Sequence, residues 1–146
     1  MNKLQYRAAV VCALTLLAGA AAGCDMQGET IGFRGGEVVS RDGRFALEIP
    51  RGALDHEVEI GIEEVDCDVA VVGTCYQVHP VGTAFLKPAL ATFEVGGMEA
   101  SPDALALAVE RDSDWNRLAD RNVDLDDEIV TASAMYLSAF AVISIE

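Results

Sequence analysis

Apolar and polar residues alternate along two stretches of the chain, and this alternation is its clearest structural signal. Residues 44–49 place Phe, Leu and Ile at every second position, and residues 57–63 do the same with Val and two Ile. Such alternation turns one row of side chains towards a core and the other towards water, as in a half-buried β-strand. Both stretches are therefore predicted to be strands.

Shorter apolar segments predict further strands, and clusters of Gly, Pro, Asp and Asn predict the turns between them. Many short strands separated in this way predict an all-β fold, an antiparallel β-sandwich of roughly seven to nine strands. No helical period is sustained after residue 24, although residues 114–121 have room for one helical turn. The further strands are expected at 76–79, 90–95, 105–110, 129–134 and 139–145, with turns at 41–43, 50–52, 96–97, 101–103 and 112–114.

The first two dozen residues have a different pattern from the rest of the chain. Lys3 and Arg7 are their only charged residues, and an apolar run from Ala8 to Ala22 follows. This run is shorter than the roughly 20 residues that a membrane-spanning helix needs. A basic start, a short apolar middle and a small-residue end are typical of a secretory signal peptide.

The segment Ala21-Ala22-Gly23-Cys24 resembles the lipobox of bacterial lipoproteins, with Ala21 in place of the more usual Leu. The resemblance implies that Cys24 becomes the new N-terminus and carries diacylglycerol on its sulfur. Two or three acyl chains, at about 0.8 kcal/mol per buried CH₂, hold a protein on a membrane. Ordinary cleavage nearby, without a lipid, is the alternative.

These features divide the chain into three parts. Residues 1–23 are predicted to be a lipoprotein signal peptide, residues 24–34 a short tether, and residues 35–146 the folded domain. The expected location is the cell envelope, on the periplasmic or surface side of a membrane to which the lipid anchors the protein.

Charge and length limit the partners that such a domain can bind. The 146 residues include 24 acidic and 10 basic side chains, for a net charge of −14. Nucleic acid is therefore excluded as a partner, because binding phosphates requires a basic surface. An apolar content of 51% is too high for a disordered acidic chain, and the length fits one domain.

Three segments resemble the ZU-five domain of ankyrins, netrin receptors, zonula-occludens proteins and many bacterial surface proteins. The first is Gly35-Gly36-Glu37-Val38-Val39 with FALEIPRGAL at 45–54, and the second is PVGTAFLKPA at 80–89. The third is Trp115 followed by YLSAF at 136–140. The resemblance implies a β-sandwich that binds other proteins or supports neighbouring domains. Since the domain stands alone here, its partner is expected to be a separate envelope protein or surface component.

Two cysteines of the predicted domain, Cys67 and Cys75, lie eight positions apart between strands. In a protein that leaves the cytoplasm, this spacing favours a disulfide that closes a short loop. The alternative is a metal site with His79, but tetrahedral zinc needs more ligands and only His56 is left to supply one.

Other chemistry-bearing residues have structural explanations. The acidic segments at 124–128, at 112–114 and around Asp66 and Asp68 are expected to be solvated turns, although calcium-dependent binding is an alternative. Trp115 is expected to plug one end of the sandwich. Motifs for a nucleophile elbow, a phosphate loop or an HExxH zinc site do not occur, so no enzyme and no cofactor are predicted.

The segment Tyr136-Leu137-Ser138 matches a place where some ZU-five relatives read His-Phe-Ser and cut themselves before the serine. There the serine hydroxyl attacks the preceding carbonyl while the histidine acts as base. Tyr136 is a poor base, because a phenol is almost wholly protonated at neutral pH. The motif is therefore interpreted as vestigial. Tyr136, Ser138 and Phe140 are expected on one face of a late strand, with Leu137 and Ala139 on the other.

Together these features predict a lipid-anchored envelope protein that presents one non-enzymatic β-sandwich as an interaction or structural module. Two alternatives stay open. One is a calcium- or carbohydrate-dependent binding domain, and the other is a domain that cleaves itself between Leu137 and Ser138.

Overall fold

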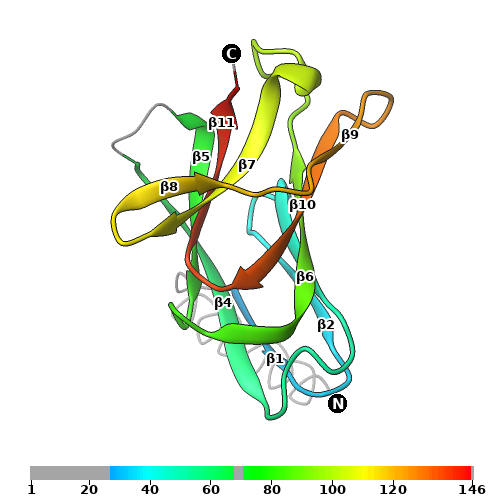
Figure 1. The fold of residues 1–146 in the computed structure, drawn as a ribbon, viewed down its shortest axis with the longest axis vertical. Helices are drawn as coiled ribbons and strands as arrows, with labels where there is room; N and C mark the ends of the chain where they lie inside the picture. The colour runs from blue at the N-terminus through cyan, green and yellow to red at the C-terminus, as the bar shows by residue number, and fades with distance from the viewer. Residues whose placement is uncertain (1–26, 68–70, 146) are drawn as a thin grey trace, which may run out of the picture.

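The computed structural model describes residues 27–67 and 71–145, which form eleven strands and one short 3₁₀ helix (Figure 1). Cys24 lies outside these residues, as do the predicted signal peptide and Asp68. The strands are β1 (Gln27–Ile31), β2 (Gly36–Val39), β3 (Phe45–Ile49), β4 (Val58–Val65), β5 (Val71–His79), β6 (Ala84–Glu94), β7 (Leu105–Arg111), β8 (Asp114–Arg117), β9 (Asn122–Asp124), β10 (Ile129–Tyr136) and β11 (Ala139–Ser144), with helix η1 at Pro102–Ala104.

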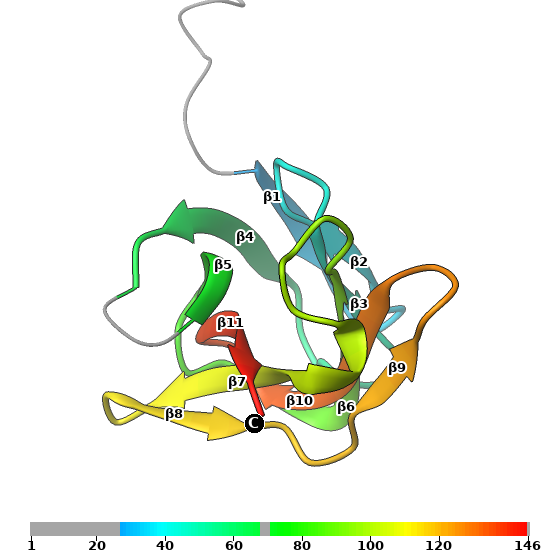
Figure 2. The same ribbon diagram turned by 90° about the horizontal axis from the view of Figure 1, so that it is seen from above.

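The strands form two antiparallel sheets, which confirms the predicted all-β sandwich. Sheet A has six strands in the order β1-β4-β5-β11-β7-β8, and sheet B has five in the order β2-β3-β6-β10-β9. Figure 2 views the molecule from above and shows the strands of both sheets arranged around one interior. No helix in the described residues is long and apolar enough to cross a lipid bilayer.

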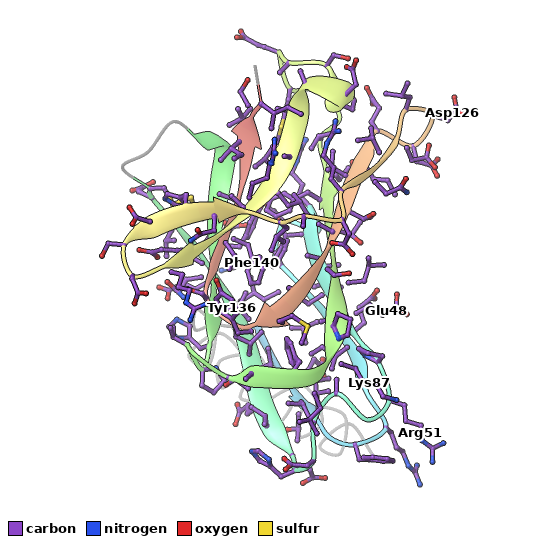
Figure 3. The ribbon with its side chains drawn as sticks, viewed as in Figure 1. Glu48, Arg51, Lys87, Asp126, Tyr136 and Phe140 are labelled. Atoms are coloured by element: carbon purple, nitrogen blue, oxygen red, sulfur yellow. A yellow bond between two sulfur atoms is a disulfide. The ribbon has the colours of Figure 1, made fainter. Side chains whose placement is uncertain are left out.

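Four aromatic rings join the two sheets at the centre of the core. Phe45 and Phe93 come from sheet B. Tyr76 comes from sheet A, as does Phe140, which is labelled in Figure 3. Their ring centroids lie 4.7–5.3 Å apart, and all four side chains are buried. Aromatic pairs at such distances contribute about 0.5–1.5 kcal/mol each beyond the burial of their area. The alternation that predicted β3 therefore points Phe45 into this cluster.

Four strands, β1, β2, β8 and β9, are additional to the seven segments that the apolar pattern predicts. All four lie at sheet edges and have three to five residues. An edge strand has one neighbour and leaves many of its side chains in water, so its sequence does not need to alternate. The expected seven to nine strands are therefore too few.

Two local predictions are wrong. The tether expected at 24–34 contains β1, whose residues 27–31 pair with β4 from Ile62 back to Val58. The segment 114–121, which has room for one helical turn, contains strand β8 instead. The late strand expected around Leu137 is two strands, because β10 ends in sheet B at Tyr136 and β11 begins in sheet A at Ala139.

Glycine at two turns, one of them predicted at 50–52, has the backbone conformation that the turn requires. Gly52 follows Pro50-Arg51 with a φ of 83°, and Gly35 has a φ of 77°. A Cβ atom at Gly35 would lie 2.2 Å from the carbonyl oxygen of Ile49, so no other residue fits there. These glycines hold β2 against the end of β3 and are structural residues.

Candidate functional site

A row of side chains crosses the outer face of sheet A, the face that points away from the core. Glu63 of β4 pairs with Gln77 of β5, which pairs in turn with Ala139 of β11. Phe140 of β11 pairs with Val109 of β7, and one position further along the same register Ala139 lies opposite Glu110. Glu110 pairs in turn with Trp115 of β8. Residues far apart in the sequence thus lie side by side on one surface.

The row leads into an open hollow of about 500 Å³, called the Trp115 hollow below. Ala139, which carries only a methyl group, is part of its lining together with polar and aromatic side chains. The hollow is lined by Val65, Asp66, Cys67, Gln77, Glu110, Ser113, Trp115 and Ala139.

A tight hairpin turn places Trp115 in this hollow. Asp112 and Ser113 connect β7 to β8 and have φ values of 53° and 69°. Two successive residues in the left-handed region suit a two-residue hairpin, because that turn follows the natural twist of the strands. Trp115 consequently lies directly opposite Glu110 and is only half-buried. The expectation that it plugs one end of the sandwich is wrong, because Trp115 lies on the outer face of sheet A, in the lining of a surface hollow.

The disulfide predicted between Cys67 and Cys75 is present and forms part of the wall. The two Cα atoms lie 6.1 Å apart, and Cys75 is buried where β5 pairs with Val65 of β4. A closed loop of this length stabilises a fold by roughly 2–3 kcal/mol in the chain-entropy view. The alternative zinc site is wrong, because both sulfurs are bonded to each other. His79 instead lies 3.4 Å from Glu63.

Several polar groups in the Trp115 hollow have little to bind within the protein. The amide of Gln77 donates one long hydrogen bond of 3.5 Å, to the carbonyl oxygen of Val78. Within residues 27–67 and 71–145, the side chains of Glu110, Ser113 and Trp115 make no hydrogen bond. The hollow therefore offers donors, acceptors and an aromatic ring to a ligand.

A second hollow, of about 410 Å³, contains the predicted vestigial motif and is called the Leu137 hollow below. It is lined by Val81, Gly82, Ala84, Glu110, Arg111, Asp112, Tyr136, Leu137 and Ser138. The peptide groups around Leu137 are already hydrogen-bonded inside the protein. Gly82 donates its N–H to the Leu137 carbonyl at 2.7 Å, and the Leu137 N–H donates to Thr83 at 2.8 Å.

Neither histidine lies in the lining of the Leu137 hollow, so the motif has no imidazole base there. His56 is exposed, and its Nδ1 lies 2.5 Å from Asp55. His79 pairs with Glu63, outside the lining. Tyr136, labelled in Figure 3, has the guanidinium of Arg111 5.8 Å from its ring centre. Ser138 itself is buried, with 8% of its surface exposed.

A buried tyrosine fixes the strand that carries Gln77. The hydroxyl of Tyr76 donates to Asp42 at 2.5 Å, and the hydroxyl of Ser40 donates to the same carboxylate at 2.6 Å. Burial and the neighbouring Asp42 carboxylate raise the pKa of Tyr76. Partial burial acts to raise the pKa of Asp42, but the hydrogen bonds from Ser40 and Tyr76 outweigh it, so the pKa is lowered. This clasp joins sheet A to the β2–β3 turn.

The acidic segment at 124–128 forms a solvated turn, as predicted. Asp124 accepts hydrogen bonds from the N–H groups of Asp126 and Asp127 at 3.0 and 3.1 Å. Figure 3 shows Asp126 at the outer tip of this turn. In the described part of the chain, no three His, Cys, Asp or Glu side chains are grouped to hold a metal ion. Calcium-dependent binding stays an untested alternative.

Sequence reasoning identified the cysteines and Trp115 but missed the Trp115 hollow. The pairings that assemble it join β4, β5, β11, β7 and β8, and no local pattern encodes these registers. The one local signal is the Asp-Ser-Asp segment just before Trp115. If this segment is interpreted as a two-residue hairpin turn, the register of the hairpin places Trp115 opposite Glu110.

Comparison with protein-family models and with curated proteins found no match to this chain. The resemblance to the ZU-five domain therefore stays a prediction from the quoted motifs. The fold and the two hollows are the basis on which a function is proposed.

Proposed function

We propose that the protein is a lipid-anchored envelope protein whose β-sandwich is a non-enzymatic binding module. The observation that carries this proposal is the position of β1. This strand begins at Gln27, three residues after Cys24. The predicted processing site is therefore very close to the first strand. This position supports a mature protein that begins at Cys24 and is folded almost from its first residue.

This spacing also determines how far the domain stands from the membrane. Three extended residues span at most about 10 Å, so a lipid on Cys24 keeps edge strand β1 within about that distance of the bilayer. The acidic chain is repelled by anionic headgroups. The domain would therefore be held close to the membrane without lying flat on it.

The side chains in the two hollows support binding more than catalysis. General acid–base or nucleophilic catalysis needs a base within hydrogen-bond reach of the reacting group. The bases available in the described linings are the carboxylates of Asp66, Glu110 and Asp112, since neither hollow is lined by a histidine. Among the described residues, no serine or tyrosine hydroxyl of either lining donates a hydrogen bond to these carboxylates, so no nucleophile is paired with a base. The peptide groups at Leu137 are engaged by Gly82 and Thr83. The Trp115 hollow instead offers unengaged polar groups beside an aromatic ring.

The experiment compares Cys24→Ser with Cys12→Ala, which changes the cysteine inside the predicted signal peptide. The proposal predicts that the wild type and Cys12→Ala carry acyl mass on the N-terminal peptide of the mature protein. Cys24→Ser should lose this mass and leave the membrane fraction. Unmodified wild-type protein in the soluble periplasmic fraction would contradict the lipid anchor.

A further inference from the structure

We propose that the Trp115 hollow binds a neutral sugar ring of a glycan. This inference rests on one part of the proposed function, namely that the sandwich is a binding module. It adds the class of ligand that the module binds. It does not depend on the lipid anchor, which is measured separately.

The aromatic ring is the first requirement for sugar recognition. One face of a pyranose ring carries C–H groups, and such a face packs well against a flat apolar ring. Trp115 supplies the largest such ring and lies half-buried in the wall of the hollow. The lining next to Trp115 includes the small side chain of Ala139, which takes up little of the space that a sugar would need.

The polar groups around the ring meet the second requirement. Sugar hydroxyls both donate and accept hydrogen bonds, so their sites combine amides, hydroxyls and carboxylates. The amide of Gln77 supplies a donor and an acceptor, the hydroxyl of Ser113 supplies both, and the carboxylate of Glu110 accepts. Hydrogen bonds to a carboxylate are about twice as strong as neutral ones.

Charge selects among sugars. Asp66 and Glu110 line the hollow, Glu63 continues the row beyond Gln77, and no Lys or Arg is part of the lining formed by the described residues. This surface repels uronic acids, sialic acids and phosphorylated sugars. The ligand is therefore expected to be neutral.

The size of the hollow limits the ligand to a short stretch of glycan. Ligand pockets for small molecules are typically about 300–1,000 Å³, and a hollow of about 500 Å³ lies within this range. It accommodates one or two sugar rings and is open to water, so the rest of a polysaccharide can extend away from the surface.

The test uses the purified mature protein, in which Trp115 is the only tryptophan. A glycan array and fluorescence titrations with maltotriose, cellotriose and N,N′,N″-triacetylchitotriose are compared with a trigalacturonate control. We expect a saturable change in tryptophan emission with at least one neutral trisaccharide. No saturable change is expected with the acidic one.

Variants then locate the binding by calorimetry. Trp115→Ala should lower the affinity about tenfold or more, and Trp115→Phe should restore part of it. Glu110→Gln should weaken neutral binding several-fold and reduce the discrimination against trigalacturonate. The matched control is Leu90→Ala, an exposed position on the outer face of sheet B, which should bind like the wild type.

Three results would overturn the proposal. The first is the absence of binding to every neutral glycan of the array and to all three trisaccharides at millimolar concentration. The second is binding that Trp115→Ala and Glu110→Gln leave unchanged. The third is binding in this hollow of peptides only. Each can occur with Cys24 acylated, so failure here is distinguishable from failure of the lipid anchor.

Discussion

The Trp115 hollow and the Leu137 hollow are similar in volume and share Glu110, but they differ in the chemistry they offer. In the Leu137 hollow the backbone groups of the motif are already paired, with Gly82 and Thr83 hydrogen-bonded to Leu137. In the Trp115 hollow the side chains of Glu110 and Ser113 have no partner among the described residues. Volume alone therefore does not identify a site. Beside the shared Glu110, the Trp115 hollow is lined by an indole ring, an amide and a hydroxyl, whereas the Leu137 hollow is lined by Tyr136 and the guanidinium of Arg111.

The largest expected effect concerns chain cleavage at the Leu137 hollow. Without a positioned base, cleavage between Leu137 and Ser138 should be slower by about 10²–10⁴ than in a complete motif. Intact-mass measurement of the purified protein should therefore show one chain. Two fragments that meet between Leu137 and Ser138 would contradict this and would restore the self-cleaving hypothesis.

The disulfide in the wall of the Trp115 hollow should have the next largest effect. Replacing both Cys67 and Cys75 with Ala should lower the free energy of unfolding by roughly 2–3 kcal/mol, because the unfolded chain loses its constraint. Urea denaturation measures the change. Reductant should destabilise the wild type by a similar amount and leave the double variant unaffected. Equal stability of the oxidised wild type and the double variant would contradict this role.

The clasp behind the Trp115 hollow should make stability depend on pH at both extremes. Because the pKa of Asp42 is lowered on folding, its stabilising effect is present above the unfolded value of 3.8 and lost as the pH falls below it. Because the pKa of Tyr76 is raised, its effect is present below 10.0 and lost at higher pH.

Tyr76→Phe isolates this hydrogen bond while keeping the ring in the core. The variant should lose about 1.5–3 kcal/mol at neutral pH, the typical range for a hydrogen bond to a charged group. It should also lose the part of the alkaline pH dependence that belongs to the phenol. The control is Tyr136→Phe, whose hydroxyl has no hydrogen-bond partner among the described residues and which should be nearly neutral. Identical pH profiles for the wild type and Tyr76→Phe would contradict the clasp.

Much of the fold could be predicted from the sequence, for a physical reason. The segments around Phe45, Ile60, Val109 and Phe140 belong to strands of sheet interiors, whose inward side chains must be apolar. The edge strands carry no such requirement, and β8 reads Asp-Trp-Asn-Arg. They form because a neighbouring strand offers hydrogen bonds, which the sequence of the edge strand does not show.

The candidate site was less predictable. The spacing of Cys67 and Cys75 predicted the disulfide, because a short loop limits the distance between them. The meeting of Gln77, Glu110 and Trp115 depends on the registers of β5 with β11 and of β7 with β8. The first of these pairings joins strands that are distant in the sequence. The site is therefore formed by the pairing of strands that are distant in the sequence, which the local sequence pattern does not show.

The most direct test of the central claim maps the ligand onto the two hollows by NMR. A neutral trisaccharide selected by the glycan titrations is added to isotope-labelled mature protein. We predict that the single indole N–H resonance of Trp115 and the side-chain amide of Gln77 shift saturably. The backbone amides of Gly82 and Leu137 should move little. Shifts concentrated on Gly82 and Leu137, or no saturable shift at Trp115, would contradict the assignment of binding to the Trp115 hollow.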